Sequence, residues 1–102
     1  MFVSIKKSTL PKYKYTAIFY DENKKKIKTT NFGSKGMNDY TLTKDKEARD
    51  RYRKRHEKDL RTNDFKRAGY LSYYVLWGES SNINTAIKDY MKRFNLKKYI
   101  SK

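Results

Sequence analysis

"YKYTAIFYDENKKKIKTTNF", residues 13–32, decides the fold, because it holds two strand-like runs separated by a short polar segment. Aromatic and β-branched residues dominate the first run, 13–20, and the second run, 26–32, mixes lysine with isoleucine, threonine and phenylalanine. Residues of these types pack well on a pleated surface. The polar segment between the runs favours a turn, so the two runs are predicted to pair as an antiparallel hairpin.

The alternation of side chains selects a register for this hairpin. If residues 21–23 form a three-residue loop with Asn23 left-handed, even-numbered residues of both strands share one face and odd-numbered residues the other. The odd face then carries the predicted core residues Tyr13, Tyr15, Ala17, Phe19, Ile27 and Thr29. The even face carries Lys12, Lys14, Lys24, Lys26 and Lys28, with Thr16 and Thr30 between them. A register shifted by one would place Phe19 beside Lys26, so we expect an aromatic inner face and a lysine-bearing outer face.

Downstream of the hairpin, the periodicity becomes helical. Residues 44–61 carry a narrow stripe at a spacing of four, which predicts a helix that touches the core along one edge. The stripe consists of Ala48, Tyr52, His56 and Leu60. Residues 66–78 are apolar on nearly all sides and predict a buried second helix that ends at Gly78. Residues 83–96 predict an amphipathic third helix. The candidate caps are Thr43 or Asp45 for the first helix and Asn82 or Asn84 for the third.

Strands followed by helices predict an α+β fold. We expect a small antiparallel sheet, formed by the hairpin and a candidate N-terminal strand at 2–6, followed by three helices packed on one face. A chain of 102 residues is of a size to build one core. Residues 1–102 are therefore predicted to form a single domain, with the sheet part in 1–36 and the helical part in 43–96.

Net charge is the strongest functional signal in the sequence. The chain has 26 Lys and Arg against 11 Asp and Glu, which leaves +15, and the excess is spread over both halves. A field of this size attracts polyanions and predicts an acidic partner. The candidate nucleic-acid-binding residues are Lys12, Lys14, Lys24, Lys26, Lys28, Lys35, Arg49, Arg51, Arg53, Lys54, Arg55, Lys92, Arg93, Lys97 and Lys98.

Two further patterns bear on nucleic-acid binding. The glycines of "FGSKG", 32–36, would let backbone amides approach a phosphate, although a strand exit that needs positive φ is the favoured interpretation. Rings interleaved with lysine at 13–20 would also suit base stacking on an open sheet face. The predicted register sends most of these rings to the core and leaves only Tyr20 and Ile18 among the lysines, so core packing is favoured over stacking.

Catalysis and metal binding find little support. The chain has no cysteine and one histidine, so it supplies neither a disulfide nor a zinc site of the usual Cys/His kind. His56 is expected to pack against the core. Carboxylates between 45 and 59 would suit magnesium, but each has a basic partner at helical spacing. The predicted pairs are Asp45–Arg49, Glu47–Arg51, Asp50–Lys54, Arg55–Asp59 and Glu57–Arg61. No enzymatic activity, cofactor or metal is therefore predicted.

Targeting signals are not evident in the sequence. The N-terminal "MFVSIKKSTL" has no apolar core of the length that a signal peptide needs, and no stretch approaches the roughly 20 apolar residues of a membrane span. We expect a soluble intracellular protein without a membrane partner.

Several stretches together resemble a family of small basic proteins encoded by giant DNA viruses of amoebae and algae. They are "FVSIKKS", "YTAIFYDEN", "KKIKTTNFGSKGMNDYTLTKDKE", "RYRKRH", "AGYLSYYVLWG" and "YMKRFNL". The resemblance covers almost the whole chain, and it departs at Asn23-Lys24, where relatives tend to carry Asn-Gly. It implies a viral protein packaged in virions, located in the virion interior and, during infection, in the viral factory of the host cytoplasm.

These observations lead to one main functional hypothesis and two alternatives. The main hypothesis is a sequence-nonspecific DNA-binding protein that neutralises phosphates and condenses or organises a viral genome. One alternative is a structural virion protein that binds an acidic capsid or core protein, and the other is a small RNA-binding protein. Self-association is left open.

Overall fold

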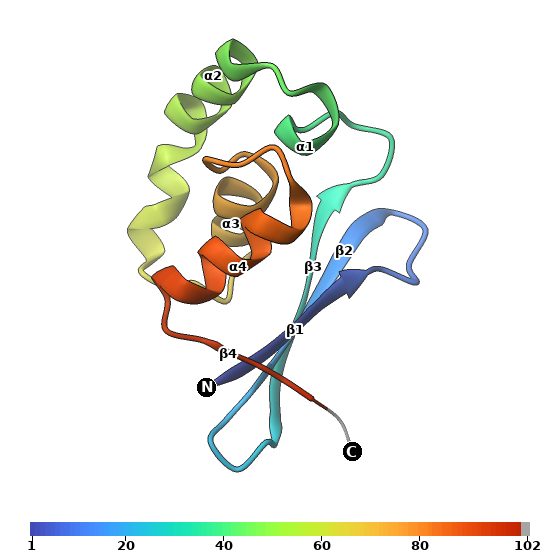
Figure 1. Ribbon diagram of the computed structural model, residues 1–102, viewed down its shortest axis with the longest axis vertical. Coiled ribbons are helices and arrows are strands. Elements are labelled where there is room, and N and C mark those ends of the chain that lie inside the picture. Colours follow the sequence, from blue (N-terminus) through green and yellow to red (C-terminus); the bar gives the residue numbers. More distant parts are fainter. Residues whose placement is uncertain (101–102) are drawn as a thin grey trace.

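Three long strands form an antiparallel sheet in the N-terminal third of the chain, as the sequence predicts. The computed structural model describes residues 1–100 and places β1 at Phe2–Lys7, β2 at Tyr13–Tyr20 and β3 at Lys26–Ser34 (Figure 1). A fourth strand, β4 at Lys97–Lys98, pairs with β1 in parallel and gives the order β3-β2-β1-β4. The prediction of a purely antiparallel sheet missed β4, because two lysines carry no strand pattern.

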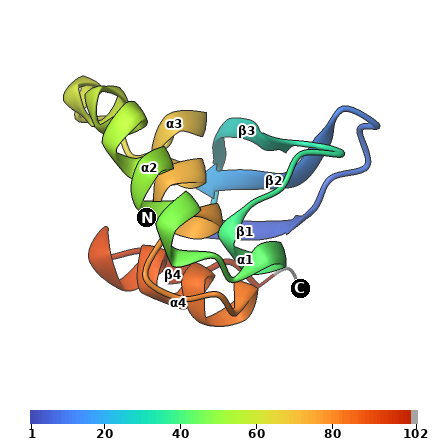
Figure 2. The same cartoon turned by 90° about the horizontal axis from the view of Figure 1, so that it is seen from above.

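Helices cover one face of this sheet (Figure 2). In chain order the helical segments are α1 (Tyr40–Thr43), α2 (Lys46–His56), η1 (Glu57–Thr62), α3 (Ala68–Leu71), η2 (Ser72–Leu76) and α4 (Ile83–Arg93). The first predicted helix divides into α2 and the 3-10 helix η1, and the second divides into α3 and the π-helical turn η2. The α+β class is confirmed. The expectation of three helices is corrected, since α1 was not predicted and two helices change their hydrogen-bonding pattern along their length.

Helix N-termini follow the predicted capping chemistry. The Asp45 carboxylate accepts hydrogen bonds from the backbone N–H groups of Glu47 and Ala48 at the start of α2. Asn82 accepts from the N–H of Thr85 at the start of α4. In both cases a side-chain oxygen satisfies backbone donors that have no partner within the helix.

The register of the hairpin differs from the predicted one. Tyr20 pairs with Lys26, but Phe19 pairs with Lys28, so a β-bulge inserts one residue into β3 and changes which residues share a face. Beyond the bulge, Tyr15 lies opposite Phe32 and their rings stack 5.8 Å apart. The predicted inner-face residue Ile27 is instead 46% exposed. The bulge is favourable because it buries the large ring of Phe32, which the predicted register placed among the lysines.

The hairpin turn also differs from the prediction in its left-handed residue. Lys24 has a φ of 62°, and its N–H donates to the carbonyl of Asp21, so Lys24 rather than Asn23 is left-handed. A side chain makes this conformation unfavourable, and glycine removes that cost. We expect Lys24→Gly to raise the free energy of unfolding by about 0.5–1 kcal/mol, measured by urea denaturation followed by circular dichroism.

Lys25→Gly is the matched control for this prediction, because it removes the same charge from the next residue, whose φ is not positive. Added backbone freedom in the unfolded chain should make this control slightly destabilising. Equal effects of the two substitutions would contradict the proposed role of the Lys24 backbone conformation.

The core lies between the inner face of the sheet and the helices. Its buried residues are Val3, Ala17, Phe19 and Phe32 from the strands and Leu71, Val75, Leu76, Tyr90 and Leu96 from the helical half. The Tyr90 hydroxyl donates to the carbonyl of Phe65, and burial raises the pKa of this phenol. α4 thus packs on the core through the face that its sequence period predicts.

Candidate nucleic-acid interface

One predicted phosphate-binding residue, Lys14, is engaged inside the fold. Its Nζ atom lies 2.5 Å from the Asp39 Oδ2 atom, and the two side chains are only 13% and 2% exposed. Asp39 also accepts from the backbone N–H and the hydroxyl of Thr41, so it caps α1. Lys14 therefore joins β2 to the start of α1, and its ammonium group is not presented to an external anion.

Two predicted arginines of α2 are held by neighbouring side chains. Arg49 lies 4.9 Å from the centroid of the Tyr40 ring, bonds Asp50 at 3.1 Å and is 14% exposed. Arg53 lies 4.7 Å from the centroid of the Tyr73 ring and bonds Glu79 at 3.0 Å. The Arg49–Asp50 pair lies within α2, whereas the contacts with the Tyr40 and Tyr73 rings and the Arg53–Glu79 ion pair connect α2 to the rest of the protein.

Most of the predicted ion pairs along α2 and η1 do not form within residues 1–100. Glu47 and Arg51 are the predicted partners that meet, at 4.0 Å. Asp59 instead lies 3.0 Å from Nδ1 of His56. The predicted pair of Glu57 with Arg61 assumed α-helical spacing, but η1 is a 3-10 helix, in which residues four apart are rotated about 120° from each other.

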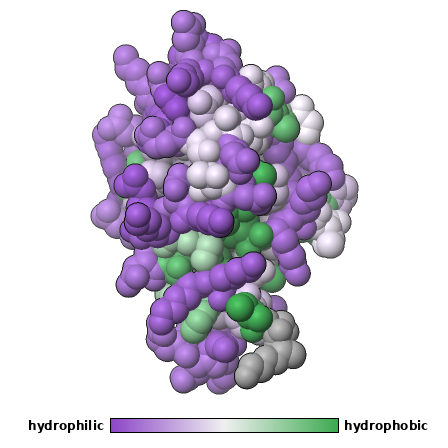
Figure 3. Space-filling model, viewed as in Figure 1, coloured by the Kyte–Doolittle hydropathy of each residue, from purple (hydrophilic) through white to green (hydrophobic). Residues whose placement is uncertain are grey.

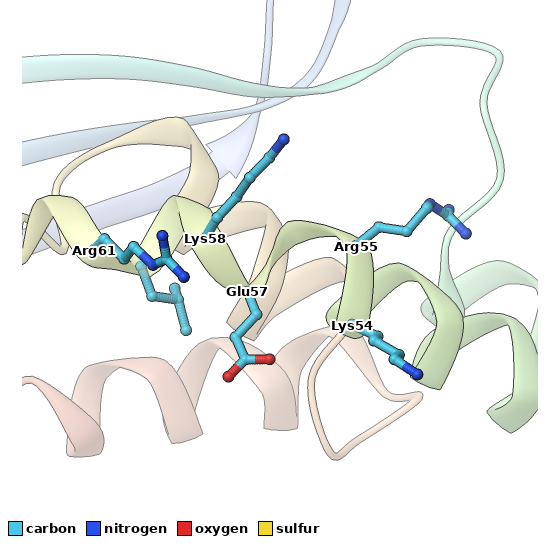
Figure 4. Close-up of a pocket in the computed structure, with 6 residues that line it drawn as sticks. Lys54, Arg55, Glu57, Lys58 and Arg61 are labelled. Atoms are coloured by element: carbon cyan, nitrogen blue, oxygen red, sulfur yellow. The ribbon is translucent and has the colours of Figure 1, made fainter.

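A group of exposed cations lies on the outside of α2 and η1. We call Arg51, Lys54, Arg55, Lys58 and Arg61 the α2–η1 basic surface. All except Arg51 line an open depression of about 470 Å³, together with Glu57 and Leu60. Figure 4 shows Arg55 and Lys58 extending from one side of the helix axis and Glu57 and Lys54 from the other. None of the four cations in the depression has an ion pair within residues 1–100.

A second group of predicted cations lies at the opposite end of the molecule. The long axis measures 41 Å, with α2 near one end and the β2–β3 turn at the other (Figure 1). Lys24, Lys26 and Lys97 belong to this hairpin end, and the Nζ atom of Lys24 lies 5.6 Å from the centroid of the Phe2 ring. In the view of Figure 3, hydrophilic side chains cover the end with α2, whereas apolar atoms show on the lower half among hydrophilic ones.

The remaining predicted cations are scattered and belong to neither group. Lys12 and Lys35 sit where β2 begins and β3 ends, joined by a backbone hydrogen bond of 3.0 Å. Lys28 lies 4.0 Å from a carboxylate oxygen of Asp64. Lys92 and Arg93 are the last two residues of α4, and the Arg93 guanidinium lies over the Tyr74 ring. Lys98 points to the opposite face of the sheet from Lys97.

A comparison with models of protein families identifies the family of the chain. Residues 3–56, more than half of its 102 residues, match the model described as "Family of unknown function (DUF5754)". The chain belongs to this family. The DUF5754 match runs from β1 to the end of α2, so it includes the hairpin and part of the α2–η1 basic surface, and η1, α3, α4 and β4 follow it. No curated protein and no solved structure shows significant similarity to the chain.

The "FGSKG" segment, which lies within the DUF5754 match, borders a second depression. Gly33 and Gly36 have φ values of 77° and 90°, as predicted for a strand exit. The depression has a volume of about 580 Å³, and Tyr52, His56 and Trp77 also line it. The Tyr52 ring stacks between the rings of His56 and Trp77, with centroid distances of 4.1 Å and 4.5 Å. His56 is therefore a packing residue that also bonds Asp59, in agreement with the interpretation of its place in the sequence.

Two members of the α2–η1 basic surface, Lys58 and Arg61, were not among the predicted binding residues of this DUF5754 chain. Arg61 was assigned to Glu57 on the assumption of a continuous α-helix, and no pattern distinguished Lys58. The change to 3-10 geometry at Glu57, which separates Arg61 from Glu57, appears only in the structure. Within residues 1–100, the structure has no His, Asp and Glu cluster suited to a metal ion, and no helix with the length and apolarity of a membrane span.

Proposed function

We propose that the protein binds the phosphate backbone of DNA without sequence specificity. The observation that carries this proposal is the α2–η1 basic surface, where Lys54, Arg55, Lys58 and Arg61 have no ion pair within residues 1–100. Such cations bind phosphates favourably because they release the counterions condensed on DNA. The guanidinium groups of Arg55 and Arg61 are also able to contact a phosphate through two parallel hydrogen bonds.

The biological role that fits this activity is condensation or organisation of a viral genome. The resemblance to basic proteins of giant DNA viruses supports packaging in the virion, and a domain with a net charge of +15 suits the neutralisation of a long polyanion. On this proposal the protein acts in the virion interior and, during infection, in the viral factory of the host cytoplasm. Contacts limited to phosphates select no base sequence.

Charge reversal on the α2–η1 basic surface tests the proposal. Arg55 and Lys58 extend on the same side of the helix axis, so the double variant Arg55→Glu, Lys58→Glu removes neighbouring contacts (Figure 4). We expect its affinity for long duplex DNA to fall about 10- to 100-fold near physiological salt, and the slope of log affinity against log salt to fall by about 2. Gel shift and light scattering at several salt concentrations measure binding and condensation.

The matched control is Lys12→Glu, Lys35→Glu, which changes the net charge equally at exposed lysines near the strand ends. We expect this control to lose less affinity for duplex DNA than Arg55→Glu, Lys58→Glu. Equal losses would contradict a localised interface, and no binding of duplex DNA by the unmodified protein would favour an acidic virion protein as partner. Tighter binding of structured RNA at matched salt would favour the RNA-binding alternative.

A further inference from the structure

The face of the sheet that points away from the helices carries a cluster of aromatic side chains. Strand pairing places Phe2 opposite Tyr20 and Val3 opposite Phe19. Because Val3 and Phe19 are buried in the core, and neighbours along a strand point to opposite faces, Phe2 and Tyr20 lie on the uncovered face. Tyr99, which follows β4, stacks on Tyr20 with ring centroids 3.6 Å apart. We call Phe2, Tyr20 and Tyr99 the outer aromatic cluster.

The outer aromatic cluster is accessible from solvent. Each of its three residues is partly exposed, and none belongs to the buried residues of the core. The strand pairing surrounds the cluster with small polar or aliphatic side chains on the same face, namely Ser4, Thr16, Ile18, Thr29 and Asn31. The helices lie on the other side of the sheet (Figure 2). A flat ligand therefore has access to those parts of the three rings that remain exposed on this face.

The charges around the cluster are mainly positive. The cations that the strand pairing and the ring contacts place on this face are Lys6, Lys24, Lys26 and Lys97. The Nζ atoms of Lys24 and Lys97 lie 5.6 Å and 6.0 Å from the centroid of the Phe2 ring. The carboxylates of the adjacent turn are already engaged, since Asp21 accepts from backbone N–H groups of the turn and Glu22 pairs with the N-terminal ammonium.

We propose that the outer aromatic cluster binds unpaired nucleobases of single-stranded nucleic acid, while Lys24 and Lys97 neutralise the flanking phosphates. Single-strand binding surfaces combine aromatic rings, on which bases stack, with cations that follow the backbone. The bases of a duplex are already stacked on each other, so they cannot use these rings. An acidic peptide would pair with the lysines, but its carboxylates offer no π-face to the rings.

This inference goes beyond the proposed binding of duplex DNA, because it uses different residues and a different ligand. The outer aromatic cluster lies at the hairpin end, whereas the α2–η1 basic surface lies toward the other end of the 41 Å axis (Figure 1). Each surface can therefore be altered without changing the other. One molecule would hold a duplex at one end and an unpaired strand at the other.

The test uses a thymidine oligonucleotide of about 15 nucleotides with 2-aminopurine at its centre, a length within the site size of known single-strand binders. Stacking of 2-aminopurine on a ring quenches its fluorescence, and anisotropy of an end label reports affinity. We expect Tyr99→Ala and Tyr20→Ala each to weaken single-strand binding about 5- to 100-fold and to abolish the quenching. Tyr99→Phe, which retains the ring, should preserve both signals.

Tyr13→Ala is the matched control, because Tyr13 is also partly exposed on β2 but lies near its other end, away from the cluster. Thermal unfolding establishes that each variant is folded. Unchanged quenching in Tyr99→Ala and Tyr20→Ala, or equally tight binding of poly-glutamate and the oligonucleotide, would overturn the inference. Failure of the duplex proposal would appear separately, as unchanged duplex affinity in Arg55→Glu, Lys58→Glu.

Discussion

Replacing Asp39 with alanine is expected to lower the free energy of unfolding by about 3–5 kcal/mol, the cost of leaving one partner of a buried ion pair uncompensated. The Asp39 side chain is 2% exposed and lies 2.5 Å from Nζ of Lys14, which is itself only 13% exposed. Alanine would leave this ammonium group without its partner. It would also remove the cap that accepts from Thr41 at the start of α1. Urea denaturation followed by circular dichroism measures the loss.

A double-mutant cycle separates the ion pair from the cap. Lys14→Met removes the buried charge and keeps an apolar stem of similar length, so the double variant Lys14→Met, Asp39→Ala should be more stable than Asp39→Ala alone. The part of the loss that remains in the double variant belongs to the cap, which is worth about 1 kcal/mol in most helices. A loss below about 1 kcal/mol in Asp39→Ala would contradict the burial of a charged pair at this position.

The second large effect is expected at Gly78, which follows the π-helical turn η2. A Cβ atom added at Gly78 would lie 2.1 Å from the carbonyl oxygen of Tyr74 and 3.0 Å from its carbonyl carbon. These are backbone atoms of the turn, so the steric clash is relieved only if η2 moves. Val75 and Leu76 of η2 are core residues. We expect Gly78→Ala to lower the free energy of unfolding by about 3 kcal/mol, at the upper end of the typical cost of overpacking. The shift of the urea midpoint measures this loss.

Gly36→Ala provides the matched comparison for Gly78. Gly36 has a φ of 90°, but a Cβ atom there would meet nothing within 4 Å. Only the backbone conformation then opposes alanine, at a cost of about 1–2 kcal/mol. If Gly36→Ala proved as destabilising as Gly78→Ala, steric contact with Tyr74 would not be the reason that glycine is required after η2.

Local patterns predicted those elements whose stability is decided by neighbouring residues. The aromatic and β-branched composition of 13–20 predicted β2, and the amphipathic period after Asn82 predicted α4. Asp45 and Asn82, each one of two predicted candidates, cap α2 and α4. In each case the side chains that matter lie within one or two turns of the element that they form, so their spacing in the sequence carries the information.

The candidate sites required contacts that no local pattern contains. Lys14 was predicted to bind phosphate, but Asp39, which is 25 residues away, engages it. The outer aromatic cluster needs Tyr99 to come beside Tyr20, and this happens only because β4 returns to pair with β1. The α2–η1 basic surface depends on the change of helix geometry at Glu57.

The sequence by itself determined the α+β class, the positions of the long strands and of α4, and a net charge of +15. The tertiary structure alone decided the hairpin register, the fourth strand and which cations remain unpaired. The physical reason is that net charge follows from composition alone and periodicity from the spacing of residues near one another in the sequence. Register and pairing instead depend on which distant side chains pack together in the core, where Phe32 is buried and Ile27 is not.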